Sequence, residues 1–134
     1  MIALDTNVVV RVVTADEPEQ LAAALALMRS QPLWLAKTVL LETEWVLRFS
    51  YRLKREAIAR SFAKLLGYRG LQVEDPGAVA QALAWYGERM DFADALHLAS
   101  SANAERFATF DGELAAAASR AGATPQIELL RARA

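Results

Sequence analysis

Four acidic residues that lie far apart in the chain have the type and placement that metal-dependent chemistry needs: Asp5, Glu42, Asp94 and Asp111. Each stands where an expected strand ends or in the first turns of an expected helix. Mg²⁺ takes oxygen ligands and is usually held by one or two carboxylates together with substrate phosphate and water. If the four side chains converge, they predict a phosphoryl-transfer site; if they do not, the chain is an ordinary small globular domain.

The elements that must position these acids alternate between short strand-like runs and longer helical runs. Such alternation favours parallel strands joined by helical crossovers, an α/β fold. Thr6 and Thr38 are expected to cap the helices that follow the first two strands. Strands are expected at residues 2–4, 33–36, 71–73 and 107–110, with a possible edge strand at 127–129, and helices at about 6–13, 16–29, 38–47, 55–66, 76–89, 91–103 and 112–119.

In an open α/β sheet, ligands bind beyond the carboxyl ends of the strands. Asp5 and Asp111 each follow an expected strand directly, so both are expected at such ends. Glu42 falls in the second turn of its helix and Asp94 in the first turn of its own. All four acids are therefore expected to face one crevice.

Composition narrows the class of protein. A chain of 134 residues with 54% hydrophobic content suits one compact domain over residues 1–134. The absence of cysteine excludes disulfides and thiolate metal sites. With a single histidine, any metal site must be built mainly from oxygen.

The first residues show no apolar signal segment, because a charge already stands at position 5. No stretch of the sequence approaches the length of a membrane span. We therefore expect a soluble cytoplasmic protein.

Charge is distributed unevenly, although the net charge is only −1. Residues 48–69 hold seven basic side chains against one acid, whereas residues 70–118 hold eight acids against two basic side chains. An acidic centre with a basic flank is what a metal-dependent nuclease needs, because cations attract phosphate and carboxylates hold the metal.

Four sequence blocks, in their order and spacing, resemble those of PIN-domain proteins, and more narrowly VapC-type toxins, the ribonuclease halves of toxin–antitoxin pairs. The blocks are Leu4 to Asn7, Val39 to Glu42, Asp91 to Leu96 and Thr109 to Asp111. The resemblance covers essentially the whole chain. It implies a three-layer α/β/α sandwich around a mainly parallel sheet.

The resemblance also implies roles for single residues. Asp5, Glu42 and Asp94 match the core metal-binding acids of the family, and Asp111 matches a fourth, more variable acid. Asn7 and Thr109 match supporting polar positions. The implied reaction is hydrolysis of an RNA phosphodiester by a water activated on Mg²⁺ or Mn²⁺. The implied partners are a second copy of the chain and a VapB-type antitoxin whose C-terminal segment blocks the site.

Each acid also has a structural interpretation. Asp5 and Asp111 are each placed to act as helix-capping acids. Residues two apart on a helix point to different faces, so only one of Glu42 and Glu44 can enter the crevice. Glu42 is preferred because it follows three apolar residues and matches the position that the resemblance implies. Glu44 is then expected to be a surface acid that is solvated or paired with a basic residue. Asp91 is the better N-cap of its helix, with a capping or supporting role beside Asp94.

Other residues leave alternatives open. His97 is either a ligand or general base, or a packed or partly exposed side chain. The three tryptophans, Trp34, Trp45 and Trp85, are interpreted as core or dimer-interface residues rather than base-stacking platforms. The basic stretch is either a solvated helical face or a contact surface for RNA phosphate or antitoxin, with the helically spaced Arg48, Arg52 and Arg55 as the first candidates.

Two other classes of protein compete with the nuclease. One is a PIN-like module that binds or assembles without catalysis, with its acids serving as caps. The other is a phosphotransferase with Asp5 as the nucleophile, which would need a catalytic lysine. Lys37 is the only candidate for this catalytic lysine, and it is better interpreted as a surface residue.

Overall fold

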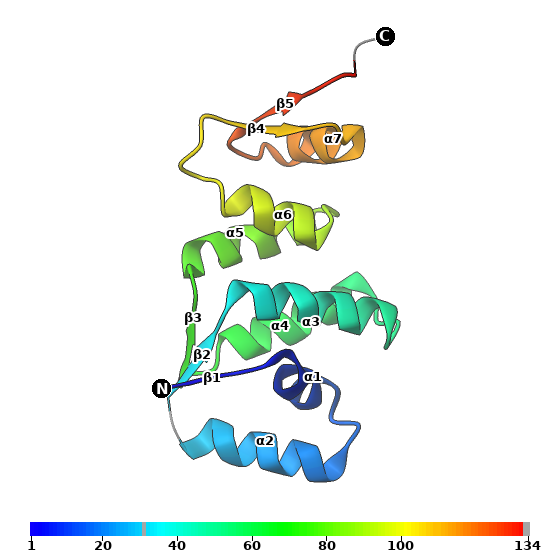
Figure 1. The fold of residues 1–134 in the computed structure, drawn as a ribbon. Helices are drawn as coiled ribbons and strands as arrows, with labels where there is room; N and C mark the ends of the chain where they lie inside the picture. Colours follow the sequence, from blue (N-terminus) through cyan, green and yellow to red (C-terminus); the bar gives the residue numbers. More distant parts are fainter. Residues whose placement is uncertain (31, 133–134) are drawn as a thin grey trace. The chain divides into compact units, whose positions relative to one another are not determined.

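The structure, a computed structural model, describes residues 1–30 and 32–132. The chain divides into two compact units, Met1–Asp75 and Pro76–Ala134 (Figure 1). We call them the first and the second unit. Every strand pair is parallel, so the α/β class with parallel strands is confirmed.

The first unit is built on a three-stranded parallel sheet with the order β1-β2-β3. Its strands are β1 (Ile2–Ala3), β2 (Leu33–Leu35) and β3 (Leu71–Val73). The helices α1 (Thr6–Thr14) and α2 (Pro18–Ser30) connect β1 to β2, and α3 (Lys37–Phe49) and α4 (Arg55–Leu66) connect β2 to β3. Because the strands are parallel, their carboxyl ends share one edge of the sheet.

Apolar side chains from the sheet and from the crossover helices form the core of the first unit. Leu33 and Leu35 of β2 are fully buried, as are Leu40 and Leu47 of α3 and Phe62 of α4. Within this unit, α1 lies between α2 and α3 (Figure 1). Burying each of these side chains stabilises the fold by about 1.5–3 kcal/mol, so the crossover helices hold the short strands in register.

A polar network joins the end of α1 to the residues that follow α3. Arg11 donates to the hydroxyl of Tyr51 at 2.8 Å, and this hydroxyl donates to Asp16 at 2.9 Å. The hydroxyl groups of Thr14 and Tyr51 hold the pKa of the Asp16 carboxyl below its usual value, because both donate to the ionised form. The network therefore fixes the turn between α1 and α2 against the end of α3.

In its described residues, the second unit contains three helices and a two-stranded parallel sheet. It contains α5 (Pro76–Gly87), α6 (Phe92–Ala99), β4 (Arg106–Thr109), α7 (Gly112–Ala121) and β5 (Gln126–Leu129). The helices α5 and α6 pack side by side, with the rings of Tyr86 and Phe92 edge to face at 5.2 Å. The helix α7 returns the chain from β4 to β5, so the expected edge strand is confirmed.

The expected elements are present, with differences at their ends. Neither predicted threonine cap was right: Asp5 and Ala36 are the N-cap residues of α1 and α3, and the Thr6 hydroxyl bonds elsewhere. The helix expected over residues 91–103 ends at Ala99, and the Ser101 hydroxyl donates to the carbonyl of His97 at 2.8 Å. Serine side chains that bond to nearby backbone favour such helix ends.

Across the described ranges, 1–30 and 32–132, none of the helices has the length and apolar character that crossing a membrane requires.

Candidate metal-binding and catalytic site

Asp5 stands directly after β1 and is the N-cap residue of α1. Its backbone carbonyl accepts from the amides of Val8 and Val9 at 3.1 and 3.3 Å. Its side chain is exposed and makes no capping hydrogen bond. The helix start therefore uses the backbone of Asp5 and not its carboxylate, which favours the chemical interpretation of this acid over the capping one.

Thr6 connects the acid-bearing ends of α1 and α3. Its hydroxyl donates to Oε1 of Glu42, although the two residues are 36 positions apart. Thr6 is buried, whereas Glu42 is exposed in the second turn of α3. The hydroxyl next to Asp5 thus fixes the carboxylate of Glu42 within the first unit. The sequence indicated Thr6 only as a cap, and this positioning role was missed.

Glu44 differs from the expectation that it lies on the surface. Its side chain is 2% exposed and accepts from Arg48 at 2.8 and 3.3 Å. The expected pairing with a basic residue is correct, but the pair is built into the packed side of α3. Glu42 and Glu44 do point to different faces, and only Glu42 presents its carboxylate to solvent.

The N-terminus of α3 is held by acids that follow β3. The Lys37 amide donates to Glu74 at 2.9 Å, so a side chain from outside the helix accepts from an amide in its first turn. The Lys37 ammonium pairs with Asp75 at 3.1 Å. These contacts fix the helix that carries Glu42 to the carboxyl edge of the sheet.

In the second unit, Asp91 caps α6. Its Oδ2 atom accepts from the amide of Asp94 at 3.1 Å, so the predicted capping role is confirmed. Asp94 lies half-buried in the first turn of that helix. The cap therefore fixes the backbone of the residue that was predicted to do the chemistry.

Asp94 carries negative charge that its surroundings do not neutralise. Burial raises the pKa of its carboxyl, and the charges of Asp91 and Asp111 raise it further. His97 opposes the shift only in part. A carboxylate that is half-buried beside two others is an unfavourable arrangement in the absence of a cation.

Asp111 begins α7 as its N-cap. Its Oδ1 atom accepts from the amides of Glu113 and Leu114 at 2.9 and 3.2 Å. The hydroxyl of Thr109 accepts from the Asp111 amide at 3.0 Å, which orients the turn after β4. Capping is thus a real role of Asp111, and both capping bonds use a single carboxylate oxygen.

The candidate acids are divided between the two units: Asp5 and Glu42 belong to the first, and Asp94 and Asp111 to the second. Within either unit, the described residues include no group of three or more acidic or histidine side chains placed to hold a metal ion. Their convergence stays a prediction. The donor chemistry fits a hard divalent cation, because carboxylate oxygens are the ligands that Mg²⁺ and Mn²⁺ accept.

The remaining candidates occupy varied positions. Arg48, Arg52 and Arg55 do not share one helix, because α3 ends at Phe49 and α4 begins at Arg55. Arg52 lies in the loop between these helices with φ 54°, and its side chain is exposed. Asn7 and His97 are also exposed.

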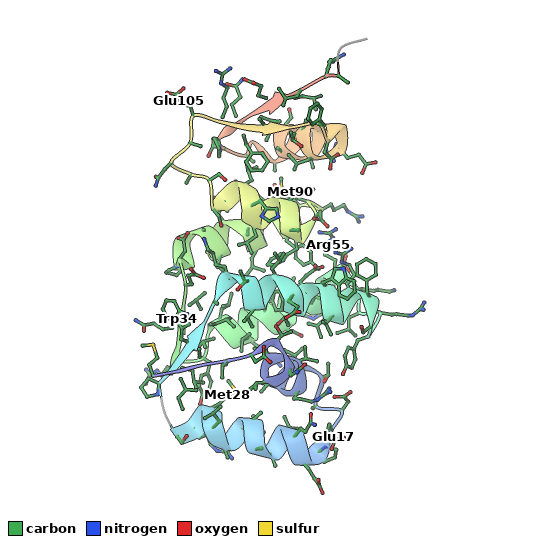
Figure 2. The ribbon with its side chains drawn as sticks, in the orientation of Figure 1. Glu17, Met28, Trp34, Arg55, Met90 and Glu105 are labelled. Atoms are coloured by element: carbon green, nitrogen blue, oxygen red, sulfur yellow. The ribbon has the colours of Figure 1, made fainter. Side chains whose placement is uncertain are left out.

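Of the three tryptophans, Trp85 is 6% exposed and belongs to the core, as predicted. Trp34 on β2 is half-buried (Figure 2). Trp45 is 54% exposed, so it is not a core residue, and the alternative that it lies in a dimer interface stays a prediction.

A cavity of about 500 Å³ lies in the first unit and is apolar on most of its walls. It is lined by residues of α1, α2 and α4, among them Val12, Val13, Leu25 and the buried Met28 (Figure 2). None of the candidate acids lines it. The proposed chemistry therefore lies elsewhere.

Parallel strands, helical crossovers and carboxylates placed after strand ends define an α/β protein with an acid-rich candidate site. The model of the PIN domain family matches residues 2–120, which run through both units. The chain belongs to the PIN-domain family.

Among solved structures, the chain is similar to the VapC20 toxin of Mycobacterium tuberculosis, described as cleaving the sarcin-ricin loop. The two share 23% identity, the match covers 92% of this chain and 97% of that one, and the TM-score is 0.44. No curated protein matches this chain.

The two neighbouring glutamates are expected to respond differently to the same change. Glu44→Gln should lower the free energy of unfolding by about 1–3 kcal/mol, because it weakens buried charge-assisted hydrogen bonds. Glu42→Gln should change it by less than about 0.5 kcal/mol, since the amide oxygen still accepts from Thr6 in an exposed position. Urea denaturation followed by circular dichroism measures both values. Equal stabilities would contradict the assignment of Glu44 as a packed, structural acid.

Asp94→Asn is expected to stabilise the protein at neutral pH when no divalent cation is present. A raised pKa means that the folded state disfavours the ionised carboxylate, so the stability deficit exists above the raised pKa. It disappears as the pH falls toward the ordinary value of 3.8. The site is half-exposed and therefore screened, so we expect a gain of about 2 °C in Tm at pH 7.

Melting curves of both proteins between pH 7 and pH 4 in chelator measure this difference. The gain should shrink as the pH falls. A gain that does not depend on pH, or a loss of Tm at pH 7, would show that Asp94 is not electrostatically strained.

Proposed function

We propose that this PIN-domain protein is a metal-dependent ribonuclease that hydrolyses RNA phosphodiester bonds and acts as the toxin of a toxin–antitoxin pair. The arrangement at the start of α1 carries the proposal. There the Asp5 carboxylate is exposed and unused in capping, while the adjacent Thr6 holds Glu42. Membership of the PIN-domain family supports this function.

The proposal places Asp5, Glu42, Asp94 and Asp111 in one metal site formed by residues 1–134 as a single domain. Two observations support it. The family model runs through both units, and the unneutralised charge around Asp94 in the second unit suits a cation.

Each residue has a stated part in the reaction. Asp5 would ligate the cation directly, Asp94 and Glu42 would bind it directly or through water, and Asp111 would complete the site. Thr6 orients Glu42, and Asp91 fixes the first turn of α6. A bound divalent cation, Mg²⁺ or Mn²⁺, supplies an acidified water and neutralises charge on the phosphate. Asn7 and Thr109 support the acids, and the protein forms no covalent bond to the RNA.

The competing classes make different demands on the same residues. A PIN-like module without catalysis needs its acids only as caps, and Asp5 makes no capping bond with its side chain. A phosphotransferase with Asp5 as nucleophile needs a lysine that is available for catalysis. The ammonium of Lys37 is engaged with Asp75. The metal-dependent nuclease is therefore the function that the site supports best.

The proposed partners are RNA as substrate, a VapB-type antitoxin and a second copy of the chain. The proposed location is the cytoplasm. The basic stretch over residues 48–69 supports a polyanionic substrate, because its charge is complementary to phosphate.

The cleavage test uses the purified chain and a panel of structured RNAs with Mg²⁺, with Mn²⁺ or with chelator. We expect cleavage only in the presence of a divalent cation. Asp5→Asn and Asp94→Asn should each reduce the rate by at least about 100-fold, because each removes one negative charge from the proposed metal site. Gel electrophoresis of the products measures the rates.

Glu17→Gln and Glu105→Gln are the matched controls, one in each unit, since both residues are exposed and neither is a proposed site residue. Both are labelled in Figure 2. Both controls should cleave at the rate of the wild type. Equal activity in all variants would indicate a contaminating nuclease and leave the non-catalytic module as the better interpretation.

The same site predicts stabilisation by metal. Excess Mg²⁺ or Mn²⁺ should raise the Tm of the wild type, because the cation binds the folded state and relieves repulsion among the carboxylates. A cation at about 100 times its Kd adds about 2.7 kcal/mol to the free energy of unfolding.

Differential scanning fluorimetry measures this rise. Glu17→Gln should retain it, and Asp5→Asn and Asp94→Asn should lose most of it. A wild-type melting curve that excess metal leaves unchanged would argue against one shared site.

A further inference from the structure

An exposed aromatic pair stands near the end of α3, outside the proposed metal site. Trp45 and Phe49 are each 54% exposed, and their ring centroids are 5.0 Å apart. The guanidinium of Arg48 lies 4.5 Å from the centroid of the Phe49 ring. Figure 2 shows the side chains of this region, where the labelled Arg55 marks the start of α4. Exposed apolar side chains that lie together, unlike single ones, are typical of interaction sites.

The pair continues the helix face that carries Glu42. Residues 42, 45 and 49 are spaced by three and then four positions, so they lie above one another on α3. At about 1.5 Å per residue, Phe49 is roughly 10 Å along the helix from Glu42. This is about the length of three stacked nucleotides at ~3.4 Å each. A strand that reaches the candidate acid along this face of α3 therefore passes the two rings.

Cations accompany the aromatic pair. Arg48 is held at 2.8 Å by the buried Glu44, which fixes its guanidinium beside Phe49. Arg52 and Lys54 follow in the loop after α3, and both are exposed. Aromatic faces on which bases stack, together with cations along the phosphate path, are the two components with which proteins bind single-stranded nucleic acid.

We propose that Trp45 and Phe49 form a base-stacking platform for single-stranded RNA, with Arg52 and Lys54 contacting its phosphates and Arg48 positioning Phe49. The proposal rests on the proposed function, because it names the part of the substrate that binds beside Glu42. Single-stranded RNA is the form recognised, since only unstacked bases can pack on side chains. The platform makes unpaired segments of a structured RNA the preferred substrates.

A second copy of the chain fits this face less well. A fully covered aromatic side chain buries about 150–250 Å², so two half-covered ones offer roughly 200 Å², against about 800 Å² per partner in a standard interface. If a two-fold axis passed through the patch, the patch would also meet itself. The cationic side chains of one copy would then lie against the same side chains of the other, namely Arg48, Arg52 and Lys54. RNA phosphate instead carries the opposite charge.

The test measures binding of the full chain to a fluorescein-labelled, eight-nucleotide single-stranded RNA and to a duplex of the same sequence. Chelator is present, so that binding is separated from cleavage. We expect the wild type to prefer the single strand. Trp45→Leu and Phe49→Leu should each weaken its binding by about tenfold, a typical effect of losing one stacked base. Leucine retains apolar area but has no aromatic face.

Trp45→Tyr is the matched rescue variant and should bind within about threefold of the wild type, because it restores the aromatic face. Arg29→Gln on α2 is the charge control for Arg52→Gln, since both arginines are exposed in the first unit. Arg52→Gln should reduce the slope of log K against log salt by about 0.7, the value for one phosphate contact of a single strand. Circular dichroism checks that every variant is folded.

Unchanged binding in both leucine variants, or a wild type that does not bind the single strand, would overturn the platform. It would also be overturned if Trp45→Asp made a dimer monomeric and left RNA binding intact, because the face would then be an interface between copies. A failure of the nuclease proposal would give a different result. RNA binding would still depend on Trp45, but the wild type would not cleave RNA in the presence of metal. Cleavage with an unchanged KM in Trp45→Leu would refute the platform alone.

Discussion

The parallel pairing of β1, β2 and β3 is the constraint on which the first unit depends. Parallel strands cannot be joined by tight turns, so each connection must return across the sheet through helices. The pairing Ile2 with Leu33 and Leu33 with Leu71 aligns the carboxyl ends of the three strands. Helices α1 and α3 therefore both begin near that edge, which allows the Thr6 hydroxyl to reach Glu42.

Local patterns were sufficient to predict most elements from the sequence. The bounds expected for α4 and β3 agree with the structure, because an apolar helical period ending at Gly67 and a short β-rich run are decided by neighbouring residues. Helix caps were predicted less well, since a threonine hydroxyl bonds to whichever acceptor the fold brings near it. The Thr6 hydroxyl donates to Glu42, and the Lys37 amide donates to Glu74.

The site features that could be predicted depend on local helix geometry, whereas those that could not depend on tertiary packing. Glu42 and Glu44 were assigned to different faces by helical geometry, which is local. The burial of Glu44 depends on how α3 packs, although its partner Arg48, four residues later, was readable as a helical ion pair. The exposure of Trp45 could not be predicted from the sequence, because an aromatic residue on an amphipathic helix usually packs against the core. Whether the acids of the two units share one cation is likewise a matter of tertiary placement.

Structural and chemical roles are compatible in the acids of the second unit. Asp91 accepts a capping bond through Oδ2, and Asp111 accepts both of its capping bonds through Oδ1. A helix N-terminus interacts favourably with a negatively charged side chain. Burial raises the pKa of Asp94, and the charges of Asp91 and Asp111 raise it further. The caps that stabilise α6 and α7 thus add to the electrostatic strain that a divalent cation would relieve.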